Sequence, residues 1–243
     1  MRGGWRDRAL LTPGARSAAA WAAAGCAVLV VALGVWVAHR SQPVWPDTWI
    51  DPLIHVRPGT RHFAKEARRL GDPLTATGYC VVVVAACVLG RRYRAALLTA
   101  IAVPAASALT EFALKPLIDR TIGGYLAFPS GHVTGVSAVA AAVIVALAGP
   151  SRPPLPRAAR WAAGVLTVVL VVVVATGMVA LGDHYATDTA GAAAVSTGMV
   201  LATALAIDVA ADALVRRRER GARGERGTAP AGELTADGAR LDR

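Results

Sequence analysis

Long apolar runs separated by short polar turns dominate the chain. Six of these runs are near the length that a helix needs to cross a bilayer. They cover residues 18–38, 74–90, 95–114, 133–149, 161–182 and 189–207. Because a single-chain membrane protein satisfies its backbone polar groups within helices, we predict an all-α, polytopic membrane protein. Its domain, residues 18–210, is expected to be a six-transmembrane-helix bundle.

Polar segments flank this domain at both ends. Residues 1–17 carry several arginines and are expected to form a cytoplasmic N-terminal segment. A basic start before an apolar run is also typical of a signal peptide. The run at 18–38 is longer than a usual signal-peptide core and further spans follow, so we interpret it as a retained helix. Residues 211–243 are rich in Arg, Gly and Glu, which predicts a disordered, basic cytoplasmic tail.

A long polar segment, residues 39–73, separates the first two spans. Its tryptophans Trp45 and Trp49 suit a membrane interface. Residues 60–70 combine apolar positions at helical spacing with basic neighbours, which predicts a short amphipathic helix that lies on the membrane or is simply solvated. The apolar positions are Phe63, Ala67 and Leu70.

Arginine-rich turns indicate the orientation of the bundle. By alternation, the N-terminus, the turn at 91–94, the loop at 152–160 and the tail fall on one side, which the positive-inside rule makes cytoplasmic. Segments 115–132 and 183–188 then lie together on the outer side. We therefore interpret the net charge of +10 as arginines that set the membrane orientation and contact anionic lipid. Nucleic acid is not an expected partner, because no basic stripe alternates with aromatic residues.

The three cysteines, Cys26, Cys80 and Cys87, all lie in apolar runs. An odd number in lipid-facing helices gives no disulfide framework, and small buried side chains are the simpler interpretation. Cys-x-x-Cys and Cys/His zinc spacings are absent from the sequence. We therefore expect no cofactor and no bound metal.

Residues 130–132, Ser-Gly-His, open the fourth apolar run. The first turn of a helix presents free backbone N–H groups and a partial positive charge, so it binds anions. Gly131 permits close approach, Ser130 adds a hydroxyl, and Lys115 and Arg120 upstream add cations. We expect Glu111, four residues before Lys115, to hold that lysine in an ion pair. Together these residues predict a pocket for a phosphoryl group.

His184 and Asp188 are four residues apart at the start of the last span. On one helix face, the carboxylate can bind one imidazole nitrogen and raise the basicity of the other. His184 would then be a nucleophile, with His132 as the general acid for the leaving group. This set needs no metal.

The same side chains allow other interpretations. His132, His184 and Asp188 could form a two-histidine, one-carboxylate metal site, which a chelator would inactivate. Each histidine taken singly is more often a capping or interfacial residue than a catalyst.

Three motifs resemble those of the type-2 phosphatidic acid phosphatase family: Lys115-x4-Arg120, residues 129–132, and His184-x3-Asp188. Their order, spacing and placement at helix ends match, as does the six-helix layout, over roughly residues 18–210. The resemblance implies that His184 forms a phosphohistidine, that Asp188 orients it, and that His132 protonates the departing group. The phosphate ligands that it implies are Lys115, Arg120, Ser130 and Gly131.

Two positions depart from the family pattern. The first motif usually ends in Arg-Pro, and the matching residues are Ile122 and Gly123; the third usually opens with Ser-Arg, and the matching residues are Gly177 and Met178. Two phosphate-binding arginines are therefore missing, and each charge-assisted bond is typically worth about 1.5–3 kcal/mol. Cations of the first outer segment could substitute. The candidates are Arg57, Arg61 and Lys65.

These observations predict an integral membrane phosphatase that hydrolyses a lipid phosphate or diphosphate at the outer face of the cell membrane. Polyprenyl diphosphate, phosphatidate and phosphatidylglycerophosphate all fit, because the head group must reach the pocket while the chains stay in the bilayer. Two alternatives remain: a non-catalytic lipid-binding or transport protein, and a lipid-linked phosphotransferase. The sequence predicts no particular oligomeric state.

Overall fold

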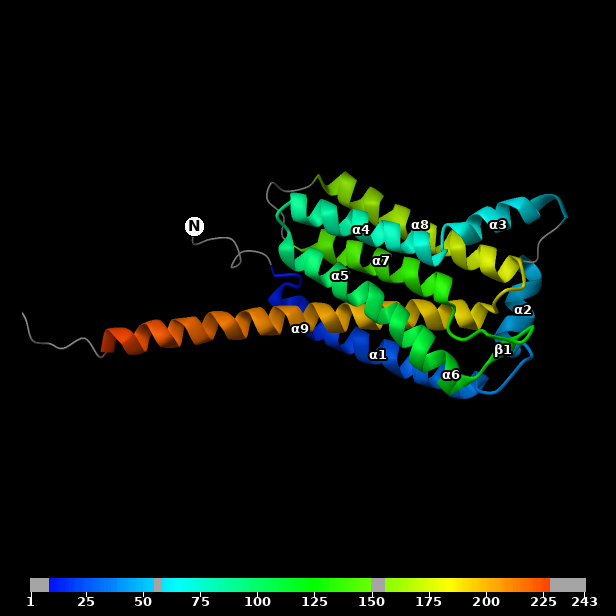
Figure 1. Ribbon diagram of the computed structural model, residues 1–243, viewed down its shortest axis with the longest axis horizontal. Helices are drawn as coiled ribbons and strands as arrows, with labels where there is room; N and C mark the ends of the chain where they lie inside the picture. The colour runs from blue at the N-terminus through cyan, green and yellow to red at the C-terminus, as the bar shows by residue number, and fades with distance from the viewer. Residues whose placement is uncertain (1–8, 55–57, 150–155, 228–243) are drawn as a thin grey trace, which may run out of the picture. The chain divides into compact units, whose positions relative to one another are not determined.

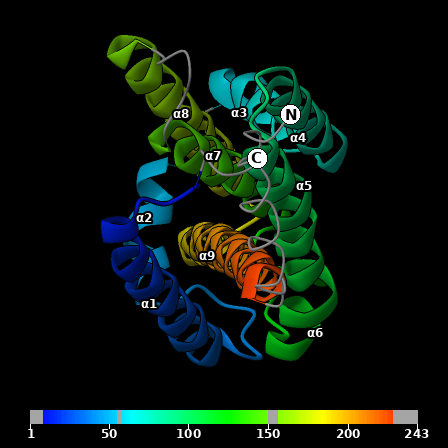
Figure 2. The same ribbon diagram turned by 90° about the vertical axis from the view of Figure 1, so that its left-hand side faces the viewer.

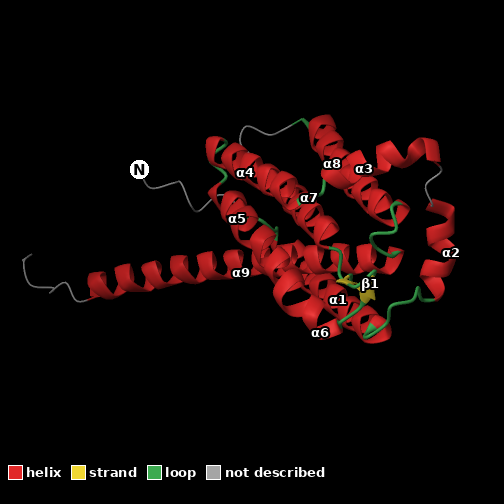
Figure 3. Ribbon diagram, turned by 45° about the vertical axis from the view of Figure 1, so that its right-hand side comes forward, coloured by secondary structure: helices red, strands yellow, loops and turns green. Residues whose placement is uncertain are grey.

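The computed structural model describes residues 9–54, 58–149 and 156–227, and almost all of them are helical (Figure 3). The elements are α1 (Pro13–Val37), α2 (Trp45–Ile54), a 3₁₀ turn η1 (Pro58–Thr60), α3 (Arg61–Arg69), α4 (Pro73–Leu89), α5 (Tyr93–Ala108), a π-helical stretch η2 (Leu109–Leu114), α6 (Lys115–Ile118), β1 (Thr121–Ile122), β2 (Tyr125–Leu126), α7 (Gly131–Ala148), α8 (Arg157–Ala180) and α9 (Ala186–Gly227). The chain divides after Ile207 into two compact units, residues 1–207 and 208–243.

Five helices of the described residues are long and apolar enough to cross a membrane, and the bent pair α3–α4 raises the number to 6. α4 has 17 residues and is slightly too short to count as a span by itself. Together with α3, from which it is bent by 49°, it is long enough. The chain is therefore a multi-pass, all-α membrane protein. The predicted number of spans is confirmed if this pair counts as one.

Small side chains build the main core. It joins α1, α4, α5, α7 and the part of α9 up to Ile207, and Figure 2 shows α9 between α1, α5 and α7. Alanine and valine allow the helix backbones to approach closely, as is usual in membrane bundles. Large apolar side chains instead cover the outward faces. Examples on α8 are Val165, Leu166 and Val172. This arrangement places the apolar surface of the bundle where it would contact lipid.

Prolines and glycines mark several helix ends. Pro13 and Pro73 occupy the first turns of α1 and α4, where a missing N–H costs nothing. Gly90 and Gly149 follow the last residues of α4 and α7. Pro104 lies inside α5, and the helix continues past it as far as Ile118 through η2 and α6.

The tail differs from the prediction of disorder. Residues 211–227 continue α9 as helix. Alanine, leucine, arginine and glutamate are good helix formers, and a helix already begun at Ala186 needs no new nucleation. The rest of the tail, residues 228–243, and residues 1–8 of the N-terminal segment lie outside the described residues.

Two helices shape the segment between the first two spans. α3 matches the predicted amphipathic helix, but it turns Ala64 inward against α8 and leaves Phe63 exposed. α2, which was not predicted, contains both Trp45 and Trp49. Figure 1 shows α2, α3, α6 and the β1–β2 hairpin gathered at one end of the bundle, where α4, α7 and α9 begin.

Candidate active site

The two predicted polar clusters meet at this end of the bundle. The backbone N–H of Ser130, before α7, donates to the carbonyl of Asp188 in the first turn of α9 at 3.2 Å. His132 and His184 lie near enough for their charges to interact. Residues more than fifty positions apart in the sequence thus form one cluster.

His184 is fixed by the end of α8. Its backbone N–H and that of Asp183 both point to the carbonyl of Met178. The side chain is only 9% exposed, and its Nδ1 lies 3.6 Å from Asp188 Oδ2, just beyond hydrogen-bond distance. Within the described part of the chain, Nδ1 has no hydrogen-bond partner. A small shift would therefore let Asp188 bind Nδ1 of His184.

Arg120 holds Asp188 from the other side. Its Nη1 donates to Asp188 Oδ1 at 2.5 Å, and its Nη2 donates to Asp47 Oδ2 at 2.7 Å. All three side chains are fully buried, and the Tyr185 ring covers the guanidinium at 4.3 Å. Buried charges are stable only with such partners. Arg120 therefore faces carboxylates, and it is not open toward a phosphate.

α2 supplies two carboxylates to the start of α9. Asp47 Oδ1 accepts the N–H of Thr187 at 2.9 Å, and Asp51 Oδ1 accepts the N–H of Ala186 at 3.2 Å. These contacts satisfy donors that a first helical turn leaves free. Burial raises the pKa of Asp51 to about 6, although its bond to Ala186 acts in the opposite direction. The sequence reasoning missed both residues; two acids one turn apart beside interfacial tryptophans were the available signal.

The first turn of α7 offers the anion site. Ser130 is fully buried, and its Oγ has no hydrogen-bond partner among the described residues. Gly131 has no room for a Cβ, because Glu111 Oε1 occupies that space, with Lys115 Nζ close by. Lys115 forms the expected ion pair with Glu111 at 2.8 Å. A carboxylate and an ammonium group therefore already lie at this helix start.

His132 has a partner that the sequence did not reveal. Its Nε2 lies 3.1 Å from Oδ1 of Asp72, the residue immediately before α4. Gly71 lets the chain pass here, since a Cβ would lie 2.5 Å from Val174 Cγ1 and 3.3 Å from the His132 carbonyl. The turn between α3 and α4 thus reaches the first turn of α7 and orients its imidazole.

The positions of the two missing arginines have other uses. Ile122 pairs with Tyr125 across the β1–β2 hairpin, whose turn is formed by Gly123 and Gly124 at φ of 57° and 86°. These left-handed conformations suit glycine. Met178 belongs to a buried apolar cluster with Val133 and Val174. Neither position presents a polar group to the site.

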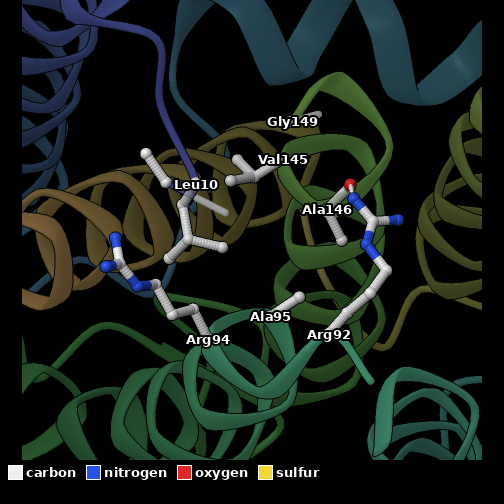
Figure 4. Close-up of a pocket in the computed structure, with 8 residues that line it drawn as sticks. Leu10, Arg92, Arg94, Ala95, Val145, Ala146 and Gly149 are labelled. Atoms are coloured by element: carbon white, nitrogen blue, oxygen red, sulfur yellow. Dashed lines mark hydrogen bonds between the residues drawn. The ribbon is translucent and has the colours of Figure 1, made fainter. Parts of the chain in front are cut away.

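Two cavities among the described residues lie away from this cluster. Figure 4 shows one of about 10 Å³, lined by residues that include Arg92, Val145 and Gly149. Val145 is about four turns along α7 from Gly131, roughly 20 Å away. A larger cavity of about 520 Å³, lined by Arg157 and Trp161 among others, is at the same far end. Neither cavity belongs to the histidine cluster.

A metal site does not emerge from this geometry. In residues 9–54, 58–149 and 156–227, no group of three His, Cys, Asp or Glu side chains converges as metal ligands. Both oxygens of Asp188 already have donors, Arg120 and the N–H of Tyr185. The groups that could carry out chemistry in this cluster are therefore its own side chains.

Comparisons with known proteins give one informative match. No protein-family model matches the sequence, and no curated protein matches it. A solved structure does match, with a TM-score of 0.61 and 18% identity over 81% of this chain and 97% of the other. It is the crystal structure of a transmembrane PAP2-type phosphatidylglycerolphosphate phosphatase from Bacillus subtilis. This chain has the transmembrane PAP2 fold. The resemblance seen in the sequence is thereby confirmed in the fold.

At this identity the PAP2 fold settles architecture, and residue roles rest on the chain's own geometry. The geometry brings together His132, His184, Asp188, Ser130, Gly131 and Lys115. It places Arg120 behind Asp188, and it adds Asp47 and Asp72, which lie outside the three motifs.

Proposed function

We propose that this protein is a metal-independent membrane phosphatase that hydrolyses a lipid phosphate or diphosphate through a phosphohistidine on His184, at the outer face of the cell membrane. The observation that carries the proposal is the junction of α7 and α9. There the backbone N–H of Ser130 donates to the carbonyl of Asp188, whose carboxylate lies 3.6 Å from Nδ1 of the buried His184. The buried Oγ of Ser130 has no hydrogen-bond partner among the described residues. A nucleophile, its orienting carboxylate and an anion-binding helix start are then in one place.

The reaction would proceed in two displacements. The phosphoryl group binds at the first turn of α7, with Ser130 and Lys115 donating to its oxygens. Nε2 of His184 attacks phosphorus, the bond from phosphorus to the lipid oxygen breaks, and His132 gives that oxygen its proton. Water then attacks the phosphohistidine and passes a proton to His132, which releases phosphate and restores His184.

Arg120 takes a positioning role in this proposal. The family resemblance implied that Arg120 binds phosphate, but the Arg120 guanidinium donates hydrogen bonds to Asp47, Asp188 and Thr187. It would hold Asp188 in the correct orientation behind His184, as the third member of such a set does in other nucleophilic sites. The phosphate then needs its cations from elsewhere.

A phosphomonoester lipid is the first substrate to test. The structurally similar protein is described as acting on phosphatidylglycerol phosphate. The cluster lies at one end of the bundle, where helices of the apolar bundle begin (Figure 1). A lipid head group at that end would leave the acyl chains in the bilayer. Phosphatidate and polyprenyl diphosphate fit the same entrance. The absence of arginine at positions 122 and 178 favours the rival interpretation of a non-catalytic lipid-binding or transport protein.

Phosphate release by purified protein in lipid nanodiscs tests the proposal. The panel comprises phosphatidylglycerophosphate, phosphatidate and a polyprenyl diphosphate, with and without chelator. We expect chelator-resistant release that His184→Ala abolishes and that the exposed control His39→Ala leaves unchanged. A labelled phosphohistidine should be trapped in the wild type. No release from folded protein on any lipid would support the binding or transport alternative, and phosphorylated product without free phosphate would indicate a phosphotransferase.

A further inference from the structure

The turn between α3 and α4 brings a cation to the catalytic cluster. Arg68, in the last turn of α3, donates from Nη1 to Asp183 Oδ2 at 3.2 Å. Asp183 immediately precedes His184, and Arg68 is near enough to His132 for their charges to interact. The side chain thus lies near His132 and contacts the residue before His184, although it belongs to none of the three motifs.

Packing between α3 and α8 fixes this position. A Cβ on Gly177 would lie 2.7 Å from Ala67 Cβ, 3.1 Å from the Ala64 carbonyl and 3.3 Å from the Arg68 backbone nitrogen. The helices therefore touch through glycine, and a larger residue would push α3 away. Gly177 is also where the third motif of the family carries serine, next to the arginine that Met178 replaces. The absence of a side chain at Gly177 lets α3 pack directly against α8.

Arg68 keeps donors available for an anion. Its side chain is 46% exposed, and among the described residues only its Nη1 has a hydrogen-bond partner. A guanidinium has five N–H donors in a planar fork, so Nε and Nη2 remain. The other cations of the cluster are engaged, Lys115 by Glu111 and Arg120 by buried carboxylates. Arg61 and Lys65 lie further back along α3, and Arg57 is outside the described residues.

We infer that Arg68 binds the phosphoryl group of the substrate, in place of the arginine that Met178 replaces, and that Asp183 positions it. This inference rests on the proposed phosphatase function. A phosphate held at the first turn of α7 would accept hydrogen bonds from Ser130 and Lys115 on one side. On the side of the α3–α4 turn it would accept them from Arg68. The cation is thus supplied by the segment between the first two spans, and not by α8.

Inorganic phosphate is the probe for the test, as a competitive inhibitor and as a stabiliser in thermal unfolding. We expect Arg68→Ala to weaken phosphate inhibition and raise the KM for lipid about tenfold or more, the size of one lost charge-assisted bond. Arg68→Lys should retain part of the affinity, because it keeps charge without the fork. The matched control is Arg69→Ala, whose arginine pairs with Glu66 on the same helix. It should change neither quantity.

Asp183→Asn separates binding from a structural role. If Arg68 only fastens α3 to the His184 turn, the loss of either partner has the same effect. Our inference instead requires Arg68→Ala to lose clearly more phosphate affinity than Asp183→Asn. Equality of these two variants, or of Arg68→Ala and Arg69→Ala, overturns the inference while His184-dependent release by the wild type still upholds the proposed function. A wild type that neither releases nor binds phosphate overturns both.

Discussion

At the scale of single residues, two aspartates of α2 do similar jobs in different electrostatic surroundings. Asp47 and Asp51 each accept a backbone N–H from the first turn of α9. Asp47 also contacts Arg120, Thr187 Oγ1 and the N–H of Val44. Burial is the main reason why the pKa of Asp51 is raised from the ordinary 3.8 to about 6, and the charges of Asp47 and Asp188 act in the same direction.

Replacing each aspartate by asparagine should separate these two cases. Asp47→Asn removes one acceptor from a fully buried network and sets an amide N–H₂ against donors, so we expect about 1–3 kcal/mol lower stability and reduced activity. Asp51→Asn keeps a carbonyl oxygen for Ala186 and removes a carboxylate that is costly to ionise, so it should not destabilise the protein at neutral pH.

The raised pKa of Asp51 also determines how protein stability changes with pH. Since the pKa of Asp51 is raised on folding, the folded protein binds the extra proton, and stability falls as pH rises from about 4 to about 6. Asp51→Asn removes that loss. Its gain in Tm over the wild type should therefore be larger at pH 7.5 than at pH 4.5, measured by thermal unfolding in detergent. A gain independent of pH would contradict this assignment.

Local spacing was enough to predict some residues of the site and not others. His184 with Asp188, and Glu111 with Lys115, are i,i+4 pairs, so one helix turn already defines their contact. Arg120 meets Asp47 across 73 residues and His132 meets Asp72 across 60. No periodicity links such positions. Arg120 therefore looked like a phosphate ligand until its buried partners were known.

At the scale of elements, the contact of α3 with α8 depends on one glycine. Gly177→Ala would place a methyl group against Ala67 and the Ala64 carbonyl, so α3 must move and carry Arg68 with it. We expect a higher KM for lipid phosphate with the helical fold retained. Gly164→Ala is the matched control on α8, because nothing lies within 4 Å of its new Cβ. It should leave KM unchanged and slightly favour the helix.

Long apolar runs predicted the spanning helices, but irregular elements were missed. α2 is short and contains Pro52, which weakens any helical pattern. The β1–β2 hairpin has only two residues in each strand, and its Gly123-Gly124 turn was taken for a polar loop. The π-helical stretch Leu109–Leu114 leaves no sequence period of its own. Tertiary contacts, which a sequence pattern does not contain, decide all three.

At the scale of the unit formed by residues 1–207, every group of the proposed site lies at one end of the bundle. The arginine-containing turn at 91–94 and the start of α8, which carries Arg157 and Arg160, lie at the other end (Figure 1). From the positive-inside rule we propose that this other end is cytoplasmic. The proposed orientation thus follows from charges that have no part in the chemistry.

Cysteine labelling in intact cells tests the orientation. In a variant without Cys26, Cys80 and Cys87, Tyr125→Cys on the exposed hairpin should react with a membrane-impermeant maleimide added outside. Ala158→Cys, exposed at the start of α8, should react only after the membrane is permeabilised. The opposite labelling pattern would place the site in the cytoplasm.

The buried network around Arg120 also has a consequence for biogenesis. Asp47 belongs to the segment between the first two spans, whereas Thr187 and Asp188 belong to the start of the last span. Thr187, which contacts Asp47, lies 140 residues after it in the sequence. During synthesis Arg120 can meet Asp47 long before Asp188 exists. The proposed catalytic centre is therefore completed only when the last part of the bundle is made. A ribosome-bound chain stopped at the end of α8, at Ala180, would have Arg120 and Asp47 but would lack both His184 and Asp188.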